Sequence, residues 1–216
     1  MRIGVLVDGQ AEFRGLPHLL QRIVTPHQVL SQPLYCDIQP FATPAQMALA
    51  ASKRFPLLIR RGANLVVILV DKESRPECTG ELAFSIAQEA RLRLSRMATA
   101  VELAVVLKVT SFENWLVSDP SVLRQLPGLF SNPDRIEKQV MLGRADTVNA
   151  LGLLTACSKL GQLEKTRDSV AICKVLDPAT AARNSRSFGK LLRVLGSPSA
   201  PSAVRRAVRT KSRRRK

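Results

Sequence analysis

Three apolar runs constrain the fold of this chain more than any other feature. They are RIGVLV at residues 2–7, LVVILV at residues 65–70 and VELAVVLKV at residues 101–109. Each run is short and rich in β-branched residues, which is typical of strands buried on both faces of a parallel sheet. A fourth and shorter strand is predicted at residues 34–41, LYCDIQPF.

Segments with helical spacing connect these strands. Residues 12–24 and 80–97 each place apolar side chains on one helical face. Between them, Thr43 is predicted as the N-cap and Pro44 as the first residue of a helix that breaks once and ends at Gly62. The alternation of strands and helices predicts an α/β fold, with a sheet of about four mainly parallel strands and helices on both faces.

The chain becomes helical from about residue 112. Helices are predicted in five segments: 112–119, from Asn132 onward with Glu137 at a capping position, 144–158, 164–176, and 184–195 with Asn184 or Ser185 as the N-cap. We therefore expect an α/β core at residues 1–111 and a helical C-terminal subdomain, residues 112–195, packed on that core. Residues 196–216 are predicted to form a disordered basic tail.

The chain is strongly basic, with a formal net charge of +16. Residues 197–216 hold eight Lys or Arg and no acidic residue, so residues 1–196 keep a net charge of +8. This balance favours polyanionic partners, above all DNA or RNA, which bind through their phosphates. A solvated tail without a specific partner is the alternative. The tail arginines predicted to contact nucleic acid are Arg205, Arg206 and Arg209.

Composition and spacing argue against several classes of protein. No apolar stretch approaches the roughly 18 residues that span a bilayer, so we expect no membrane association and a cytoplasmic location. The four cysteines are scattered and lie far from the two histidines, so we expect reduced, mostly buried thiols rather than a zinc site. The turn DGQAEFRG after the first strand has neither a dinucleotide-binding nor a P-loop glycine pattern.

Acidic residues follow two of the predicted strands. Asp8 comes directly after the first strand, and Asp71 and Glu73 follow the strand at residues 65–70. The i, i+2 spacing of Asp71 and Glu73 directs both side chains to the same side of an extended backbone. Ligands of open α/β sheets bind beyond the carboxyl ends of the strands. If the two strands are neighbours, these acids meet there, and Glu12 at the start of the next helix can reach the same crevice.

Such a group of acids needs compensation for its negative charge. Two unit charges about 4 Å apart repel each other by about 4 kcal/mol at an effective dielectric constant near 20. Either the pKa values of the acids rise, or Lys72 or an arginine pairs with them, or a hard divalent cation binds. Ligation by carboxylates alone, without histidine or cysteine, favours Mg²⁺ or Mn²⁺.

Four segments, in this order, resemble a known family. VLVDGQAE, VVILVDKE, SFENWLVSD and DPATAARNSRSFGKLL are similar to the motifs of small bacterial Toprim-like proteins of unassigned function. Members of that family often carry E-G-x-T-E, D-x-D and F-E-x-W-L-x-x-D, and are found near ATPases in defence-type loci. The Toprim fold is shared by topoisomerases, primases and nucleases of the overcoming-lysogenization-defect class. The resemblance spans residues 1–195 and implies a Toprim/Rossmann-like sheet.

The resemblance also implies roles for individual acids. Asp8 takes the place of a first-strand glutamate that serves as general base or metal ligand, and Asp71 with Glu73 takes the place of the metal-binding D-x-D pair. The catalytic residues expected on this basis are Asp8 and Glu12, and the expected metal ligands are Asp8, Asp71, Glu73, Glu113 and Asp119.

Three positions depart from the family pattern. Asp8 is shorter than the usual glutamate by one methylene, Glu73 is longer than the usual aspartate by one, and Ala11 stands where the family often has a hydroxyl residue. The two changes of length either compensate for each other or mark a weakened activity.

Several of these residues also have simpler interpretations. Glu12 can complement the dipole of its helix instead of binding metal. Lys72 alternates to the face opposite the acids and points to solvent or to phosphate. Arg183 and Arg186 flank a helix start that favours phosphate, although a plain N-cap explains the same residues. Trp115 is more typical of core packing than of base stacking.

Together these features predict a Mg²⁺- or Mn²⁺-dependent phosphoesterase of Toprim type that acts on nucleic acid, with an ATPase partner implied by resemblance alone. The alternative is a weakly active or inactive Toprim-like scaffold that binds a partner protein or nucleic acid. A ribonuclease or an enzyme that processes small nucleotides is a third and weaker alternative.

Overall fold

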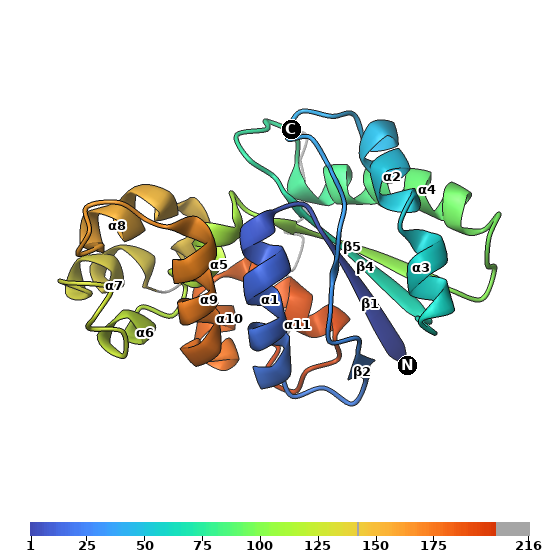
Figure 1. Ribbon diagram of the computed structural model, residues 1–216. Coiled ribbons are helices and arrows are strands. Elements are labelled where there is room, and N and C mark those ends of the chain that lie inside the picture. Colours follow the sequence, from blue (N-terminus) through green and yellow to red (C-terminus); the bar gives the residue numbers. More distant parts are fainter. Residues whose placement is uncertain (142, 202–216) are drawn as a thin grey trace, which may run out of the picture.

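A parallel sheet of five strands organises the chain (Figure 1). The structure is a computed structural model and describes residues 1–141 and 143–201. The strands follow the order β2-β1-β4-β5, and β3 pairs with β1 as well. Every strand pairing is parallel, which confirms the predicted α/β class with a mainly parallel sheet. The strands are β1 (Arg2–Val7), β2 (Gln28–Val29), β3 (Leu34–Tyr35), β4 (Leu65–Asp71) and β5 (Glu102–Lys108).

The edge beside β1 differs from the sequence expectation. The strand predicted at residues 34–41 is reduced to β3, which pairs with Leu6 and Val7 at the end of β1. The two-residue strand β2 pairs with the beginning of β1 and was not predicted. Two residues are too few to produce a period-2 pattern, so this strand has no signal in the sequence.

Helices cover both faces of the sheet, as Figure 1 shows. Side chains of β4 alternate between the faces: Val66, Ile68 and Val70 belong to one apolar core cluster, and Leu65, Val67 and Leu69 belong to the other. The first cluster includes residues of α2, α3 and α4, and the second includes residues of α1 and α11. The helices of the N-terminal half are α1 (Gln10–Arg22), α2 (Pro44–Ser52), α3 (Phe55–Arg60) and α4 (Thr79–Leu94).

The predicted helix after Thr43 forms as two helices. The Thr43 hydroxyl accepts a hydrogen bond from the amide of Gln46, and Pro44 is the first helical residue, as expected. The helical segment is interrupted between α2 and α3. It is followed by Gly62, whose φ of +82° lies in the left-handed region that glycine favours.

The C-terminal half is helical and packs against the sheet. Its apolar side chains, including the fully buried Trp115, continue the core cluster that begins on β1 and β4. The Trp115 indole donates a hydrogen bond of 2.7 Å to the Ser187 hydroxyl. The elements are α5 (Phe112–Leu116), α6 (Ser121–Arg124), α7 (Asp134–Val140), the 3-10 helix η1 (Ala145–Thr147), α8 (Ala150–Cys157), α9 (Lys165–Val175), α10 (Pro178–Asn184) and α11 (Arg186–Val194).

Three details of this half differ from expectation. The helix predicted at 144–158 is divided into η1 and α8, because Asn149 caps α8 through the amide of Gly152. Helix α10 was not predicted, although Asp177 caps it and Pro178 begins it. Glu137 does not cap α7; its carboxylate lies 2.5 Å from the Arg124 guanidinium, on the surface.

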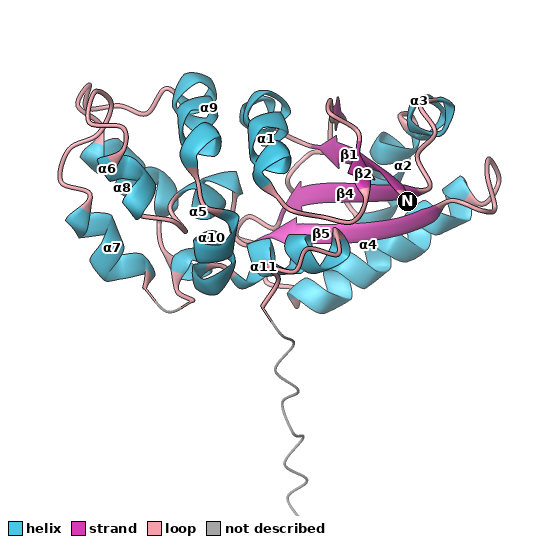
Figure 2. Cartoon of the chain, turned by 90° about the horizontal axis from the view of Figure 1, so that it is seen from below, coloured by secondary structure: helices cyan, strands magenta, loops and turns pink. Residues whose placement is uncertain are grey.

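Helices α1 and α9 lie side by side in both views (Figures 1 and 2). The Arg22 guanidinium at the end of α1 donates hydrogen bonds to carbonyls at the end of α9, at 2.8 Å for Leu176 and 3.0 Å for Lys174. The two helices therefore run in the same direction, and their N-termini lie at the same end.

Two further properties concern the whole described chain. Within residues 1–141 and 143–201, none of the helices has both the length and the apolar character that crossing a bilayer requires. All four cysteines are free in the structure, and Cys36, Cys157 and Cys173 are buried, as expected for mostly buried thiols.

Candidate metal centre

The carboxyl ends of three strands bring charged side chains to one edge of the sheet. β4 ends at Asp71 and β5 ends at Lys108, and these two residues are partners in the parallel register. β1 ends one residue before Asp8. The arrowheads of β4 and β5 point toward the helical half in Figure 2, so this edge faces α5 and its neighbours.

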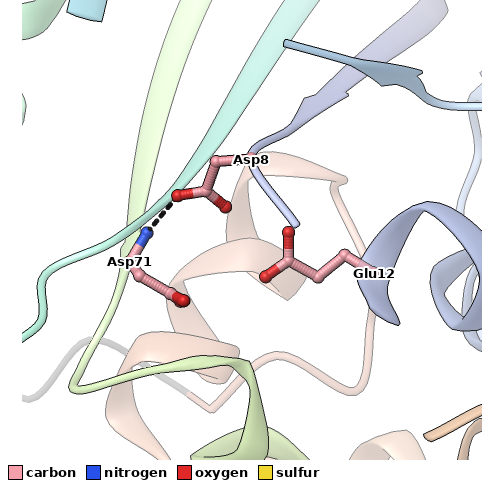
Figure 3. Close-up of side chains that lie close together, drawn as sticks. All are labelled: Asp8, Glu12 and Asp71. Carbon is pink, nitrogen blue, oxygen red and sulfur yellow. Dashed lines mark hydrogen bonds between the residues drawn. The ribbon is translucent and has the colours of Figure 1, made fainter. Parts of the chain in front are cut away.

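Asp8, Glu12 and Asp71 form an acidic triad at this edge (Figure 3). One carboxylate oxygen from each residue lies within 4.8 Å of the others, a spacing that can hold a metal ion. The amide of Asp71 donates a hydrogen bond of 2.8 Å to Asp8 Oδ2, which fixes the two strand ends relative to each other. Glu12 belongs to α1, and its Oε2 accepts a hydrogen bond of 3.0 Å from the amide of Gly9. Glu12 therefore caps its helix and belongs to the triad at once.

Lys108 lies among the three acids and is fully buried. Its Nζ lies 2.6 Å from Asp8 Oδ1 and 3.0 Å from Asp71 Oδ1. The same ammonium contacts Glu12 Oε1. Lys108 therefore supplies the counter-charge that the sequence required, in place of Lys72 or an arginine.

The environment separates the pKa values of the three acids. For Asp8, burial raises the pKa, but the charge of Lys108 and several hydrogen bonds outweigh burial, so the net shift is downward. For Glu12, burial and the neighbouring acids raise the pKa well above its usual range despite Lys108. Burial, opposed by Lys108 but aided by Asp8, raises the pKa of Asp71 to about 7. Although burial alone lowers the pKa of Lys108, the three acids raise it well above its ordinary value.

The triad also suits a hard divalent cation. When all three carboxylates are ionised, the Lys108 ammonium neutralises one of their charges, and two negative charges remain. Asp71 Oδ1 is buried and accepts no hydrogen bond, although Lys108 lies within ion-pair distance of it. A buried carboxylate oxygen that accepts no hydrogen bond, in an all-oxygen donor set, is the kind of ligand that hard cations prefer. The residues present therefore fit a bound metal ion.

A cleft of about 470 Å³ is lined by two residues of the triad, Glu12 and Asp71. Glu12, Asp71 and Glu73 line it from the sheet side, and Glu113 and Lys165 line it from the helical half. This volume lies within the range of about 300–1,000 Å³ that ligand sites usually have. The full lining comprises residues 9–12, Asp71, Glu73, residues 110–114, residues 148–151, Lys165 and Thr166.

Glu73 and Glu113 line this cleft but do not belong to the triad. Glu73 has a φ of +53°, a conformation that is uncommon outside glycine, and its amide donates to the carbonyl of Thr110 at 2.8 Å. The turn at Glu73 therefore ends the extended geometry that was expected to align it with Asp71. Glu113 pairs with Lys165 at 3.0 Å instead of joining the three acids.

The structure does not support Asp119 as a metal ligand. Its carboxylate accepts hydrogen bonds from the Ser121 hydroxyl at 2.6 Å and from the amide of Asp177 at 2.8 Å. Asp119 is 1% exposed and is not among the residues that line the cleft. Its buried carboxylate joins α6 to the start of α10, which explains an acid at this position without a metal.

The residues predicted to bind nucleic acid have different surroundings. The Lys72 ammonium donates a hydrogen bond to the carbonyl of Arg75, so its contact is within its own turn. Arg183 and Arg186 are exposed. The N-cap that was the simpler interpretation of their helix start is present. Ser185 accepts the amide of Phe188 and Asp146 accepts the amide of Ser187, so the chain's own side chains occupy the first turn of α11. Arg205, Arg206 and Arg209 lie outside the described residues.

Sequence reasoning missed Lys108 as a site residue. A signal for it was present, because Lys108 is a cation near the end of the apolar run VELAVVLKV. In a parallel sheet that run ends beside Asp71. A lysine in a strand buried on both faces requires a charged partner, and the acids at the neighbouring strand ends are the nearest such groups.

A family model described as "Domain of unknown function (DUF4276)" matches residues 7–196 of the chain. The triad, Lys108 and the cleft-lining residues all lie within the matched part. No curated protein and no solved structure matches the chain.

Proposed function

We propose that this chain, which belongs to the DUF4276 family, is a metal-dependent phosphoesterase of Toprim type that acts on nucleic acid. The observation that carries the proposal is the convergence of Asp8, Glu12 and Asp71 beyond the carboxyl ends of parallel strands, where Glu12 and Asp71 line a cleft. Bringing buried carboxylates together from three separate parts of the chain costs free energy. Binding of a divalent cation would offset this cost.

Asp8 and Asp71 are the proposed metal ligands, with Mg²⁺ or Mn²⁺ as the ion. Asp71 contributes the buried oxygen that accepts no hydrogen bond, and Asp8 contributes a carboxylate whose lowered pKa keeps it ionised. A bound divalent cation would supply charge stabilisation for a phosphate group and lower the pKa of a bound water.

Glu12 and Lys108 have complementary roles in this proposal. The raised pKa of Glu12, caused by burial and by its acidic neighbours, suits a group that takes up and returns a proton. Lys108 holds the three carboxylates in one arrangement through its ammonium contacts. Because its side chain is fully buried, Lys108 acts on the reaction through the acids that it contacts.

The remaining parts of the proposal rest on charge and on resemblance. The net charge of +16 supports a nucleic-acid substrate. A cytoplasmic location, an ATPase partner and a role in bacterial defence extend the same proposal, and the resemblance to Toprim-like proteins is their support.

A non-catalytic scaffold is the second candidate, and Lys108 is the observation that favours it. Its ammonium lies where a cation would compensate the triad, so the acids are partly neutralised without any metal. On this alternative the cleft binds a partner, and the triad with Lys108 is a buried ion cluster that fixes the ends of β1, β4 and β5.

The test is cleavage of plasmid DNA, single-stranded DNA and RNA in the presence of Mn²⁺ or Mg²⁺. The wild type is compared with Asp71→Asn, which keeps the size of the side chain and removes its charge. Glu102→Gln is the matched control, because Glu102 is an exposed acid at the opposite end of β5. We expect metal-dependent cleavage by the wild type and the control, and its loss in Asp71→Asn.

Equal cleavage by Asp71→Asn and the wild type would contradict the proposed site. Absence of cleavage from all three proteins, together with no effect of metal on the melting temperature, would favour the scaffold.

A further inference from the structure

The cleft contains a fixed cation as well as acids. Lys165 is the first residue of α9, and its side chain is 55% exposed. Its Nζ lies 3.0 Å from Glu113 Oε1, and the Glu113 side chain is only 8% exposed. Both residues line the cleft. A half-exposed ammonium is therefore held at the cleft by a buried acid on a neighbouring helix.

Glu113 is ionised and engaged in this contact. Burial raises its pKa, but hydrogen bonds from Ser111 and from the backbone, together with Lys165, outweigh burial and lower it. A carboxylate committed in this way orients Lys165 and is not free to join the acidic triad. Glu113 therefore orients Lys165 and does not act as the metal ligand that the resemblance implied.

The helices that frame the cleft favour an anion near Lys165. The first residues of α1 and α9, Gln10 and Lys165, both line it; α8 also begins at the cleft, at Ala150, but Asn149 already caps it. Helix N-termini carry partial positive charge on amides that have no partner within the helix. Helices α1 and α9 run in the same direction, as the Arg22 contacts show, so their dipoles add at this end.

The cleft thus combines two kinds of charge. Asp71, with a buried oxygen that accepts no hydrogen bond, lies among the acids on the sheet side, and Lys165 lies on the helical side. A phosphodiester chain has the chemistry that matches both, because its phosphates are attracted to an ammonium and, across a cation, to carboxylates.

We propose that Lys165 binds a phosphate of the substrate strand in this cleft and that Glu113 is the positioning residue that holds Lys165. The inference deepens the proposed function and rests on it for the identity of the substrate. The acids then lie beside the strand that Lys165 anchors, which makes Lys165 a determinant of substrate affinity rather than a group that takes part in bond cleavage.

The first test is binding in the presence of EDTA, so that cleavage does not enter. The dissociation constant of a fluorescein-labelled single-stranded DNA is measured by fluorescence anisotropy at several salt concentrations. We expect Lys165→Gln to weaken binding about three- to tenfold and to reduce the slope of log K against log salt by about 1. Lys165→Arg should bind as the wild type does, and Glu113→Gln should show a smaller loss in the same direction.

Lys159→Gln is the matched control, because Lys159 is an exposed lysine just before α9 that does not line the cleft. Equal affinity and equal salt slope for Lys165→Gln and Lys159→Gln would overturn the inference.

Kinetics separate this inference from the proposed function. If the protein cleaves, Lys165→Gln should raise KM with little change in kcat, whereas Asp71→Asn should abolish kcat. If Lys165→Gln cleaves with the KM and kcat of the wild type, the inference is wrong and the proposed function is unaffected. Weaker binding by Lys165→Gln, without cleavage by any variant, would support the phosphate site and refute the phosphoesterase.

Discussion

Lys108 and Asp71 are register partners at the ends of neighbouring parallel strands, and their charged groups lie 3.0 Å apart. The strand register therefore places the counter-charge beside the acidic triad, because β5 ends at Lys108 where β4 ends at Asp71. The burial of Lys108 makes this compensation strong, since few water molecules can replace it.

Lys108→Met should destabilise the protein more than any surface substitution. The change keeps the apolar stem and removes the ammonium, so three buried carboxylates lose their partner. We expect a loss of about 3–5 kcal/mol in the free energy of unfolding at pH 8. The loss should be smaller at pH 5, because acids without their cation have raised pKa values and become protonated there. Urea denaturation at the two pH values measures both effects.

Lys53→Met is the control for this substitution, because Lys53 is an exposed residue at the end of α2. Its effect should lie within about 0.5 kcal/mol of zero. A Lys108→Met protein as stable as this control at pH 8 would show that the ammonium does not compensate the triad.

Asp71→Asn should stabilise the metal-free protein at neutral pH. The pKa of Asp71 rises from 3.8 to about 7 in the folded state, chiefly through burial. Between these two values the folded chain binds more protons than the unfolded chain, so the stability contributed by this group falls as pH rises and is constant above about 7. Removing the group should therefore raise the free energy of unfolding by about 1–3 kcal/mol at pH 8, after allowance for partial exposure.

Denaturation in EDTA at pH 4.5 and at pH 8 tests this prediction. The difference between Asp71→Asn and the wild type should grow with pH, while Glu102→Gln should track the wild type. A variant that is less stable than the wild type at pH 8 would mean that Asp71 is ionised and favourably paired in the metal-free state.

The sequence predicted the sheet well because its central strands carry a strong pattern. Apolar runs such as LVVILV fix both the strand and its burial on two faces, and the acids that follow two of these runs indicate where a site lies. Asp8, Glu12 and Asp71 were found in this way and are brought together. Helix α10 and strand β2 were missed, because each is too short for a periodic signal.

The rest of the site depends on contacts that no local pattern encodes. Glu113 and Asp119 lie only a few residues apart in one motif, yet one lines the cleft and the other ties α6 to α10. The turn that removes Glu73 from the triad depends on its pairing with Thr110. Tertiary partners such as Lys165 and Asp177 decide these roles, and they lie more than 50 residues away in the chain.

Asp146→Ala and Arg186→Ala form a matched pair at the start of α11. Asp146 accepts hydrogen bonds from the Ser185 and Ser187 hydroxyls and from the amide of Ser187, all in the buried interior. Its removal leaves several buried donors without an acceptor and should cost about 2–4 kcal/mol. Arg186 is exposed, and its removal should change stability by less than about 0.5 kcal/mol. Equal melting temperatures for the two variants would contradict the structural role of Asp146.

Arg186→Ala also tests the phosphate site predicted at this helix start. Because Ser185 and Asp146 occupy the first turn of α11, affinity for single-stranded DNA should change no more than it does in Lys159→Gln. Fluorescence anisotropy decides between the two outcomes, and a loss as large as that of Lys165→Gln would restore a phosphate role for this helix start.

Truncation after residue 201 should reduce the salt dependence of nucleic-acid binding. Residues 202–216 contain eight Lys or Arg. Each phosphate that these side chains neutralise contributes about 0.7–0.9 to the slope of log K against log salt. We therefore expect a slope that is shallower by several units and weaker binding at low salt, with the melting temperature unchanged. An unchanged slope would show that the basic surface of residues 1–201 accounts for the binding.

Mn²⁺ and Mg²⁺ should raise the melting temperature of the wild type. A ligand that binds only the folded state at one hundred times its dissociation constant adds about 2.7 kcal/mol, which corresponds to a shift of about 5–10 °C for a chain of this size. The shift should persist in Glu102→Gln and disappear in Asp71→Asn, because only the latter removes the charge of a carboxylate in the triad. Ca²⁺, which accepts longer and less regular coordination, should give a smaller shift if the triad selects a small cation. Equal shifts in all three proteins would locate the metal outside the triad, and no shift in the wild type would leave Lys108 as the only cation that this cluster binds.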